Sequence, residues 1–576
     1  MKKIKLLIGF LYCLSIISCK KDFLDSTKPE DKITSADVWK SPELALKVVN
    51  GAYFALPPGH TYFLMMSATD EGMFQFNDLP TPFTHGLITA NTLGSFGQSN
   101  WAVGQADWSW SAVYKNIRNI NIAIANLDQV PFKTETEKNR AKADAYFLRG
   151  FSYFMLMAQF GGVILYEQPV VLGEDYAKTR NTFEETVNFI VADLDNAVSL
   201  YDGNEIASVK TRGDKGVAMA VKAKVLLYAA SDLHNSAKNG VVTSGYANPE
   251  LLGYVGGDPA ARWQAARDAA KAVIDLNKYH LYTGNSNTVR NFEEIFITRH
   301  DEDIFLRYLD KNIDWYWQVG RTPFYEGSPG YGGWGVNSVL GNVVDAFEMS
   351  DGSKFDWSNP AHKANPFANR DPRLYASVLM EGSDWHPRSA TANKVRVGKW
   401  PDGSTAPDAL RSNYYLRKFS DLAKGPASYD DFEKCPPWTR MRYAEVLLNY
   451  AEACIELGQD AEARTYINMI RERAGMPPVT ESGAALKERY RNERRVELAF
   501  EDQRFFDVRR WLIGPQSAED GYGVEVLYPV QGSFNNPTFN KVVVDPGRTW
   551  VNKAYFLPIT TDELNKNTAL IQNPGY

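Results

Sequence analysis

Hydrophobic residues recur at steps of three and four along much of the chain, which is the spacing of helices that bury one face. One run starts at Trp110, which we expect in the core, and reaches Leu127. Ser41 followed by Pro42 is typical of a helix start. The same signals predict helices at about 42–53, 110–127, 143–157, 182–200, 213–231 and 261–277.

Two further helices near the C-terminus form a pair. An apolar stripe over 443–455 ends at Gly458, and a second stripe starts at Ala463 and stops at Gly475. The pair is close to the roughly 34-residue period of tetratricopeptide repeats, and small Ala faces large Tyr within it. Three or four such pairs recur, so we predict a mainly α-helical, tetratricopeptide-like scaffold of stacked helix pairs.

Helical spacing fails in two regions. The first spans about 57–105 and is dense in Gly, Asn, Thr and Phe. The second spans about 280–435, where Gly, Pro, Asn and Trp accumulate. A segment of this length is too long for a connector. We expect an irregular, loop-rich insertion that rests on the scaffold and carries function.

The N-terminus predicts export and lipidation. Three lysines precede an apolar run at 6–17, which is too short to span a bilayer and fits a secretory signal peptide over 1–18. Ser18-Cys19 resembles the bacterial lipobox, so we predict acylation of Cys19, palmitate included, and a lipidated tether over 19–35. A plain signal peptide with an incidental cysteine is the alternative. We expect a lipid-anchored protein at the surface of the outer membrane.

Composition and residue spacing argue against several classes of protein. The net charge of −6 over 576 residues argues against a nucleic-acid binder. Four cysteines exclude a disulfide scaffold, and no histidine pair has zinc-ligand spacing. A G-x-G-x-x-G match at 330–335 follows a loop rather than a strand, so neither a cofactor nor a metal is predicted. The carboxylates Asp70/Glu71 and 301–303 leave a glycoside hydrolase open as a less favoured reading.

Several blocks in order resemble one family. Segments 22–25, 110–121, 441–453, 491–511, 555–559 and 572–576 are similar to the SusD/RagB family of surface nutrient-binding lipoproteins. The resemblance implies non-catalytic capture of oligosaccharides, or of peptides in the RagB branch, for a SusC-like TonB-dependent transporter. The pattern of helical and irregular stretches divides the mature chain into a helical region at 36–279 with a ligand loop at 57–105, the insertion at 280–435, and a C-terminal helical region at 436–576.

We interpret the charged residues of segment 487–510 as structural rather than as part of a ligand site. Three pairs of opposite charge are spaced three or four apart, as ion pairs within a helix would be. We expect them to lie on a solvated helix or in a partly buried network, not in a ligand site. The pairs are Arg489/Glu493, Arg494/Glu497 and Glu501/Arg504.

Aromatic residues in loops are the candidate binding site. A sugar face of about 50 Å² on one ring contributes on the order of 1 kcal/mol, so two or three rings are needed. The two predicted aromatic clusters, each with its polar neighbours, are Phe74, Phe76, Asn100, Trp101 and Trp108, and Trp315, Tyr316, Trp317, Tyr331 and Trp334. Asp70 and Arg321 are expected to hydrogen-bond sugar hydroxyls. Peptide ligands and a purely structural repeat scaffold remain alternatives.

Overall fold

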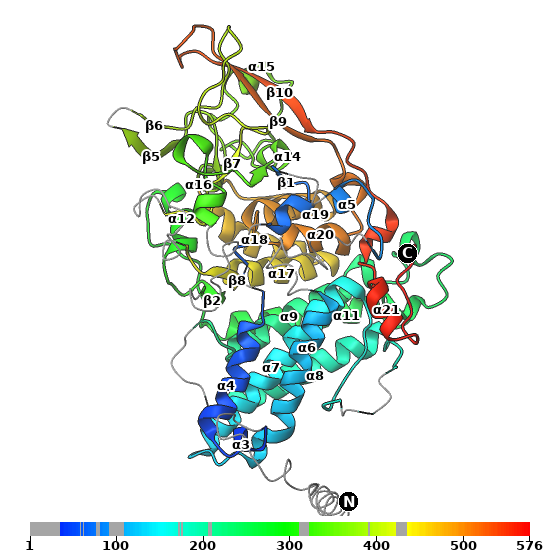
Figure 1. Cartoon of the computed structure of the whole chain (residues 1–576). Helices are drawn as coiled ribbons and strands as arrows, with labels where there is room; N and C mark the ends of the chain where they lie inside the picture. Colours follow the sequence, from blue (N-terminus) through cyan, green and yellow to red (C-terminus); the bar gives the residue numbers. More distant parts are fainter. Residues whose placement is uncertain are drawn as a thin grey trace, which may run out of the picture.

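The computed structural model describes residues 35–57, 59–61, 63–76, 81–91, 109–170, 173, 177–204, 210–309, 322–389, 392–421 and 435–576. The described chain is mainly helical, which confirms the predicted fold class. Long helices fill the lower and central parts of the molecule, and short strands and loops form the upper part (Figure 1).

The helical scaffold follows the predicted periodicity closely. Ser41 accepts a hydrogen bond from Leu44 N at 3.4 Å and so caps the first long helix. Gly475, at φ +74°, ends the α18 helix in the left-handed conformation. The scaffold helices are α4 (Pro42–Phe54), α6 (Trp110–Asn126), α7 (Glu135–Phe160), α8 (Phe183–Tyr201), α9 (Lys215–Ala230), α11 (Pro259–Asp275), α17 (Tyr443–Glu456), α18 (Asp460–Ala474), α19 (Gly483–Glu497) and α20 (Gln503–Arg510).

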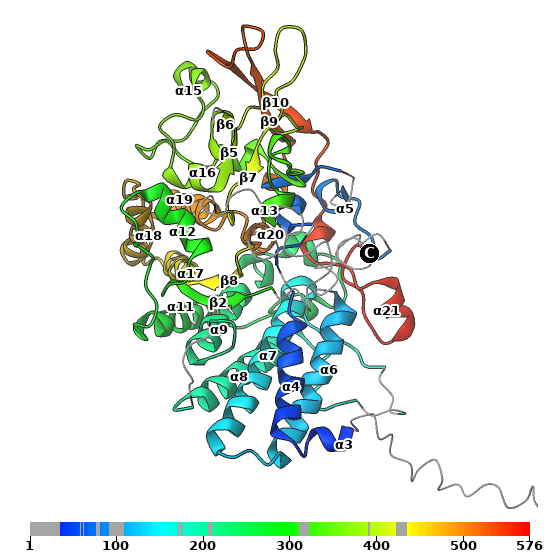
Figure 2. The same cartoon turned by 60° about the vertical axis from the view of Figure 1, so that its left-hand side comes forward.

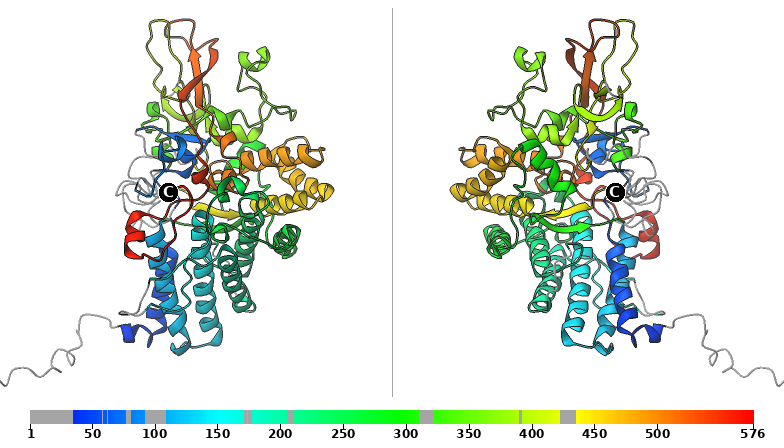
Figure 3. Two further views of the ribbon diagram at one scale, coloured as in Figure 1. Left: turned by 90° about the vertical axis from the view of Figure 1, so that its right-hand side faces the viewer. Right: turned by 90° about the vertical axis from the view of Figure 1, so that its left-hand side faces the viewer.

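Each scaffold helix packs on the next, in the order α4, α6, α7, α8, α9, α11, α17 and α18 (Figure 2). The large core between them is rich in Ala, Tyr and Phe, and Trp110 lies in it as predicted. Helices α17 to α19 extend to one side of the long axis (Figure 3). Although α11 and α17 are neighbours in space, the whole insertion separates them in sequence.

The insertion leaves and re-enters the scaffold through a two-stranded antiparallel sheet. Strand β2 (Asp303–Arg307) pairs with β8 (Trp438–Arg442), with Arg307 opposite Trp438. Beyond this neck the chain forms a second hydrophobic core, which includes Phe347, Trp385 and Tyr414. The hairpin of β9 (Gly521–Leu527) and β10 (Thr538–Asp545), which the sequence pattern did not reveal, contributes Val524 to the same core.

The longest helix in the described part of the insertion, α12 (Thr288–Ile297), was not predicted from the sequence. Asn287 caps it, and Phe292, Ile295 and Phe296 face the second core. The remaining short elements are α3 (Ser35–Val38), β1 (Gly72–Phe74), α5 (Thr81–Thr84), α10 (Gly240–Thr243), α13 (Thr322–Tyr325), β3 (Asn337–Val339), α14 (Gly341–Val344), α15 (Pro360–Ala364), α16 (Pro372–Ser377), β4 (Val378–Leu379), β5 (Asp384–Ser389), β6 (Ala392–Lys394), β7 (Tyr415–Leu416) and α21 (Thr561–Lys566). Among the described residues, no helix is both long and apolar enough to cross a membrane.

The charged C-terminal block forms a buried network and not a solvated helix. The helix breaks at Phe500 and Asp502, both at positive φ, into α19 and α20. Of the expected pairs within the helix, none forms among the described ion pairs; Arg489 pairs with Glu348, Arg494 with Asp507, and Arg504 with Asp70. The prediction of local pairing was therefore wrong, because these side chains pair with other segments: Glu348 and Asp70 are far away in sequence, and Asp507 lies on α20.

Glu497 lies at the centre of this network. It is fully buried and accepts hydrogen bonds from Arg442 at 2.6 Å, from Arg373 at 2.9 Å, and from Arg473. These arginines come from β8, α16 and α18. The network thus joins the scaffold to the insertion.

Candidate functional site

A short antiparallel sheet brings the two predicted loop regions together. Strand β1 pairs with β3, with Gly72 opposite Val339 and Phe74 opposite Asn337. Gln75 N continues the pairing by donating to Val336 O at 2.8 Å. As a result, the loop region that follows α4 and the middle of the insertion form one surface.

An aromatic patch lies on this surface; we define it as Phe76, Phe324, Tyr325 and Trp334. The Phe76 and Trp334 rings meet edge to face, with centroids 6.3 Å apart and planes at 84°. Trp334 also contacts Phe324 and Tyr325, each at 5.5 Å. Phe76 is 54% exposed and Trp334 is 38% exposed. Two large rings therefore face solvent on a packed aromatic base.

A buried carboxyl group supports the patch from below. Glu326 accepts hydrogen bonds from Asn337 N and Nδ2, both at 2.8 Å. Asn337 Oδ1 in turn accepts from Leu64 N at 3.0 Å and from Ser67 Oγ at 2.8 Å. Burial raises the pKa of Glu326 to about 8, although the hydrogen bonds from Asn337 lower it. These bonds fix the insertion to the segment that carries Phe76.

The structure places Asp70 and Phe74 away from solvent, which corrects the expectation that they face a ligand. Arg504 donates to both oxygens of Asp70, and Arg495 donates to one, all at 2.8 Å. Burial would raise the pKa of Asp70, but Arg495 and Arg504 outweigh it and hold the pKa well below its usual range. Phe74 is 2% exposed and packs on Phe63.

The other candidates have mixed outcomes. Tyr331 is half-buried and packs against the second core. The remaining candidates and the lipidation site lie outside the described residues: Cys19, Asn100, Trp101, Trp108, Trp315, Tyr316, Trp317 and Arg321. Sequence reasoning missed Phe324, Tyr325 and Glu326. Their signal was an aromatic pair directly before a glycine-rich loop.

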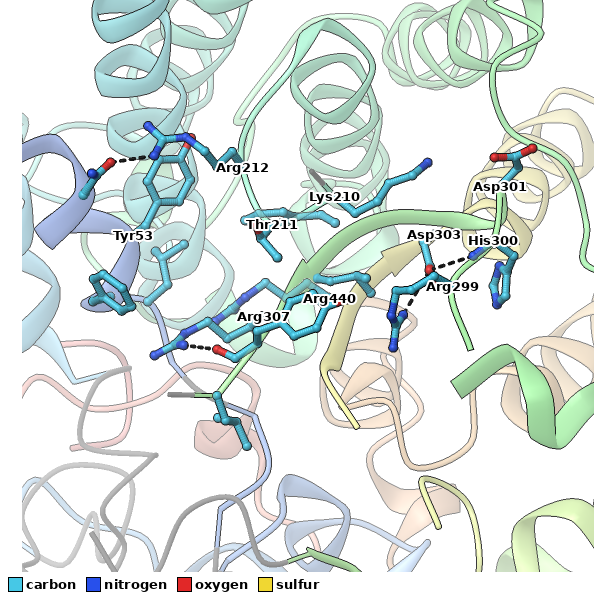
Figure 4. A pocket seen from close by; sticks show the side chains of 17 residues that line it. Tyr53, Lys210, Thr211, Arg212, Arg299, His300, Asp301, Asp303, Arg307 and Arg440 are labelled. Atoms are coloured by element: carbon cyan, nitrogen blue, oxygen red, sulfur yellow. Dashed lines mark hydrogen bonds and ion pairs between the residues drawn. The ribbon is translucent and has the colours of Figure 1, made fainter. Parts of the chain in front are cut away.

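A separate pocket of about 840 Å³ lies at the neck between scaffold and insertion (Figure 4). Two exposed rings line it, Phe54 at 42% and Tyr308 at 46%, and neither was a candidate from the sequence. The Arg307 guanidinium lies 5.5 Å from the centre of the Phe54 ring, and Arg299 lies 5.4 Å from that of Tyr308. This neck pocket is the main alternative to the aromatic patch as a place for a ligand.

The described residues include no cluster of three or more His, Cys, Asp or Glu side chains that could hold a metal ion. Asp70 and Glu71, once considered as an acid pair, are both buried. Burial, followed by the charge of Asp70, raises the pKa of Glu71 to about 8.

Comparisons with known proteins agree with one another. The family described as the SusD family matches residues 301–576, and one described as starch-binding and associating with the outer membrane matches 22–227. SusD-like protein P2 of Formosa agariphila is 27% identical over 497 residues, which is 82% of this chain and 81% of that protein. A SusD-like protein of Bacteroides ovatus is 21% identical over 88% of this chain and 83% of its own.

Solved structures show the same fold. A SusD-like protein of Bacteroides fragilis superposes with a TM-score of 0.75 at 26% identity, over 96% of this chain and 100% of that one. A second protein of the same organism, described as a SusD-like carbohydrate-binding protein, gives a TM-score of 0.69 at 22% identity, over 93% of this chain and 100% of its own.

Proposed function

The chain belongs to the SusD family, and from this premise we propose that it binds oligosaccharide or polysaccharide nutrients without catalysis at the outer membrane. The single observation that carries the proposal is the aromatic patch, where Phe76 and Trp334 meet edge to face and are both exposed. The descriptions of one matching family and of one related structure name starch and carbohydrate as ligands, which agrees with this chemistry.

Exposed rings suit sugars because each pyranose presents an apolar C–H face. Covering about 50 Å² of that face contributes on the order of 1 kcal/mol per ring. Such a site binds weakly and reversibly, as a protein that hands its ligand on requires.

The place and partner of the protein form the second part of the proposal. Acylation of Cys19 would anchor the chain in the outer membrane, since two or three acyl chains give stable attachment where one does not. A SusC-like TonB-dependent transporter is the proposed recipient of the ligand. Co-purification of a membrane barrel protein with the lipidated chain from its native outer membrane tests this partner.

A binding experiment distinguishes glycan ligands from peptide ligands, which are the alternative suggested by the RagB branch. The chain from residue 20 onward would be applied to an array that carries neutral glycans, acidic glycans and peptides. We expect retention on glycans, and Trp334→Ala and Phe76→Ala should reduce it without lowering the melting temperature. Tyr308→Ala in the neck pocket serves as the comparison, because the exposed fraction of Tyr308, 46%, lies between those of Trp334 and Phe76. If Tyr308→Ala reduces retention and the patch variants do not, the ligand lies in the neck pocket.

Catalysis is tested with the same material. The glycan that binds best would be incubated with the protein and assayed for new reducing ends. Any turnover that scales with protein concentration would contradict a binding-only role. Retention on peptides but not on glycans would contradict the carbohydrate assignment.

A further inference from the structure

A small cavity lies where helices α5 and α20 meet the segment that follows β10. Its volume is about 20 Å³, which admits one water molecule or one ion of similar size, since a water needs about 10–15 Å³. Among the described lining residues none carries a carboxylate. The polar ones are Thr69, Thr84, Arg509, Ser517, Arg548, Thr549 and Trp550.

Arg509 is a buried cation without an acidic partner in the described part of the chain. It is 4% exposed, and its one hydrogen bond there runs from Nη1 to Phe505 O at 2.8 Å. Its Nε atom is buried and finds no acceptor among the described residues. The neighbouring Arg548, by contrast, pairs with Asp545 at 2.7 Å. Burying a charge without a counter-charge is costly, so an anion at this position would stabilise Arg509.

Trp550, which also lines the cavity, carries a second buried donor. The indole Nε1 of Trp550 makes no hydrogen bond to any described residue. The guanidinium carbon of Arg509 lies 5.4 Å from the Trp550 ring centre and 3.5 Å from that of Phe505. The two rings flank the cation but cannot accept its in-plane N–H groups in the way that an anion can. Burial also lowers the pKa of Arg509 to about 9, which agrees with a cation short of compensation.

We propose that this cavity binds a small monatomic anion, with chloride as the test ligand, between Arg509 and Trp550. The anion would tie α20 to the segment at 548–550 and to Thr69, three residues before β1. It would therefore stiffen the base of the strand that leads to Phe76. The proposal is independent of which ligand the aromatic patch binds.

Thermal unfolding in chloride and in gluconate at equal ionic strength tests the site. A ligand that binds the folded state raises the melting temperature as the ligand concentration increases, and the rise becomes slower once the site is filled. We expect chloride and bromide to raise the midpoint above that in gluconate, and Arg509→Met to remove the difference. Trp550→Phe, which deletes the N–H but keeps a ring, should shift the response to higher chloride. Trp400→Phe is the matched control, since it loses an indole hydrogen bond to Ser533 O elsewhere and should respond as the wild type does.

Bromide diffraction provides a measurement that does not depend on any variant. Crystals of the wild-type protein grown in bromide should show an anomalous peak within hydrogen-bond distance of Arg509 and Trp550. Equal midpoints in chloride and gluconate would overturn the proposal. So would density at this position without an anomalous signal, because that is the signature of a water molecule.

Discussion

Replacing Glu497 by Gln tests whether the buried network holds the insertion on the scaffold. The substitution keeps the size of the side chain and removes the charge that Arg442, Arg473 and Arg373 share. Burial would raise the pKa of Glu497, but these three guanidinium groups outweigh it and hold the pKa below its ordinary range. The carboxylate is therefore ionised at neutral pH, and its loss leaves three buried cations short of one counter-charge.

The magnitude follows from the complete burial of the pairs. Removing one partner of a buried ion pair costs about 3–5 kcal/mol, because the remaining charge stays buried. With an unfolding entropy of roughly 2.1 cal/mol/K per residue, a chain of this length loses about 2–4 °C in Tm if it unfolds as one unit. On the same helix, Glu488→Gln is the control, since that side chain is 72% exposed and its loss costs about 0–1 kcal/mol.

The assay is urea unfolding followed by circular dichroism between pH 5 and pH 8. The stability that Glu497 supplies is present above its unfolded pKa of 4.5 and is lost as pH falls through the lower folded value, so the gap between wild type and variant should persist over this range. If the free energies of unfolding of Glu497→Gln and of the Glu488→Gln control differ by less than about 1 kcal/mol, the reasoning is refuted.

Three further outcomes are expected. Burial raises the pKa of Glu326 to about 8, so the stability that protonated Glu326 contributes is complete below pH 4.5 and is lost as pH rises through 8. Between pH 5 and pH 9 the free energy of unfolding should therefore fall less in Glu326→Gln than in the wild type. Gly335→Ala should destabilise by about 1–3 kcal/mol in urea, since φ is +55° and a Cβ would lie 2.7 Å from Leu410. A Cβ at Gly332, also at positive φ, would have no described atom within 4 Å apart from its chain neighbours, so Gly332→Ala should cost about 1 kcal/mol. Cys454 is fully buried and burial raises its pKa to about 11, so a thiol reagent should modify it only after the protein unfolds. Modification of Cys454 in the folded protein would contradict this expectation.

Helices of the scaffold could be predicted because their signals are local. Apolar spacing, the Ser41 cap and the Gly475 terminator all lie within a few residues of the structure they specify. Helix α12 was missed because it is short and because the sequence on both sides of it has no helical pattern. The signals were nevertheless present: Asn287 is a favourable cap, and Phe292 and Phe296 have helical spacing.

The buried network could not be predicted from spacing alone. Arg494 and Glu497 are three apart, which suggests a local pair, but their partners come from other elements. The sequence does not reveal that α19 is surrounded by other elements, and burial turns the same residues from surface pairs into a core network.

The candidate site was predicted in part. Phe76 and Trp334 could be identified as aromatic residues in loops, and both are exposed. Their meeting depends on the pairing of β1 with β3, each three residues long, and strands of this length leave no periodic pattern. Whether Asp70 faces solvent depended on Arg495 and Arg504, more than 400 residues away in the chain.

The most direct test of the account is the affinity of the best glycan from the array for the Phe76→Ala/Trp334→Ala double variant, measured by isothermal titration calorimetry beside wild type and Tyr308→Ala. At about 1 kcal/mol per ring, the double variant should bind roughly 30-fold more weakly, with Tyr308→Ala unchanged and the glycan recovered intact. Wild-type affinity in the double variant would contradict the aromatic patch as the binding site, and release of shorter products would contradict binding without catalysis.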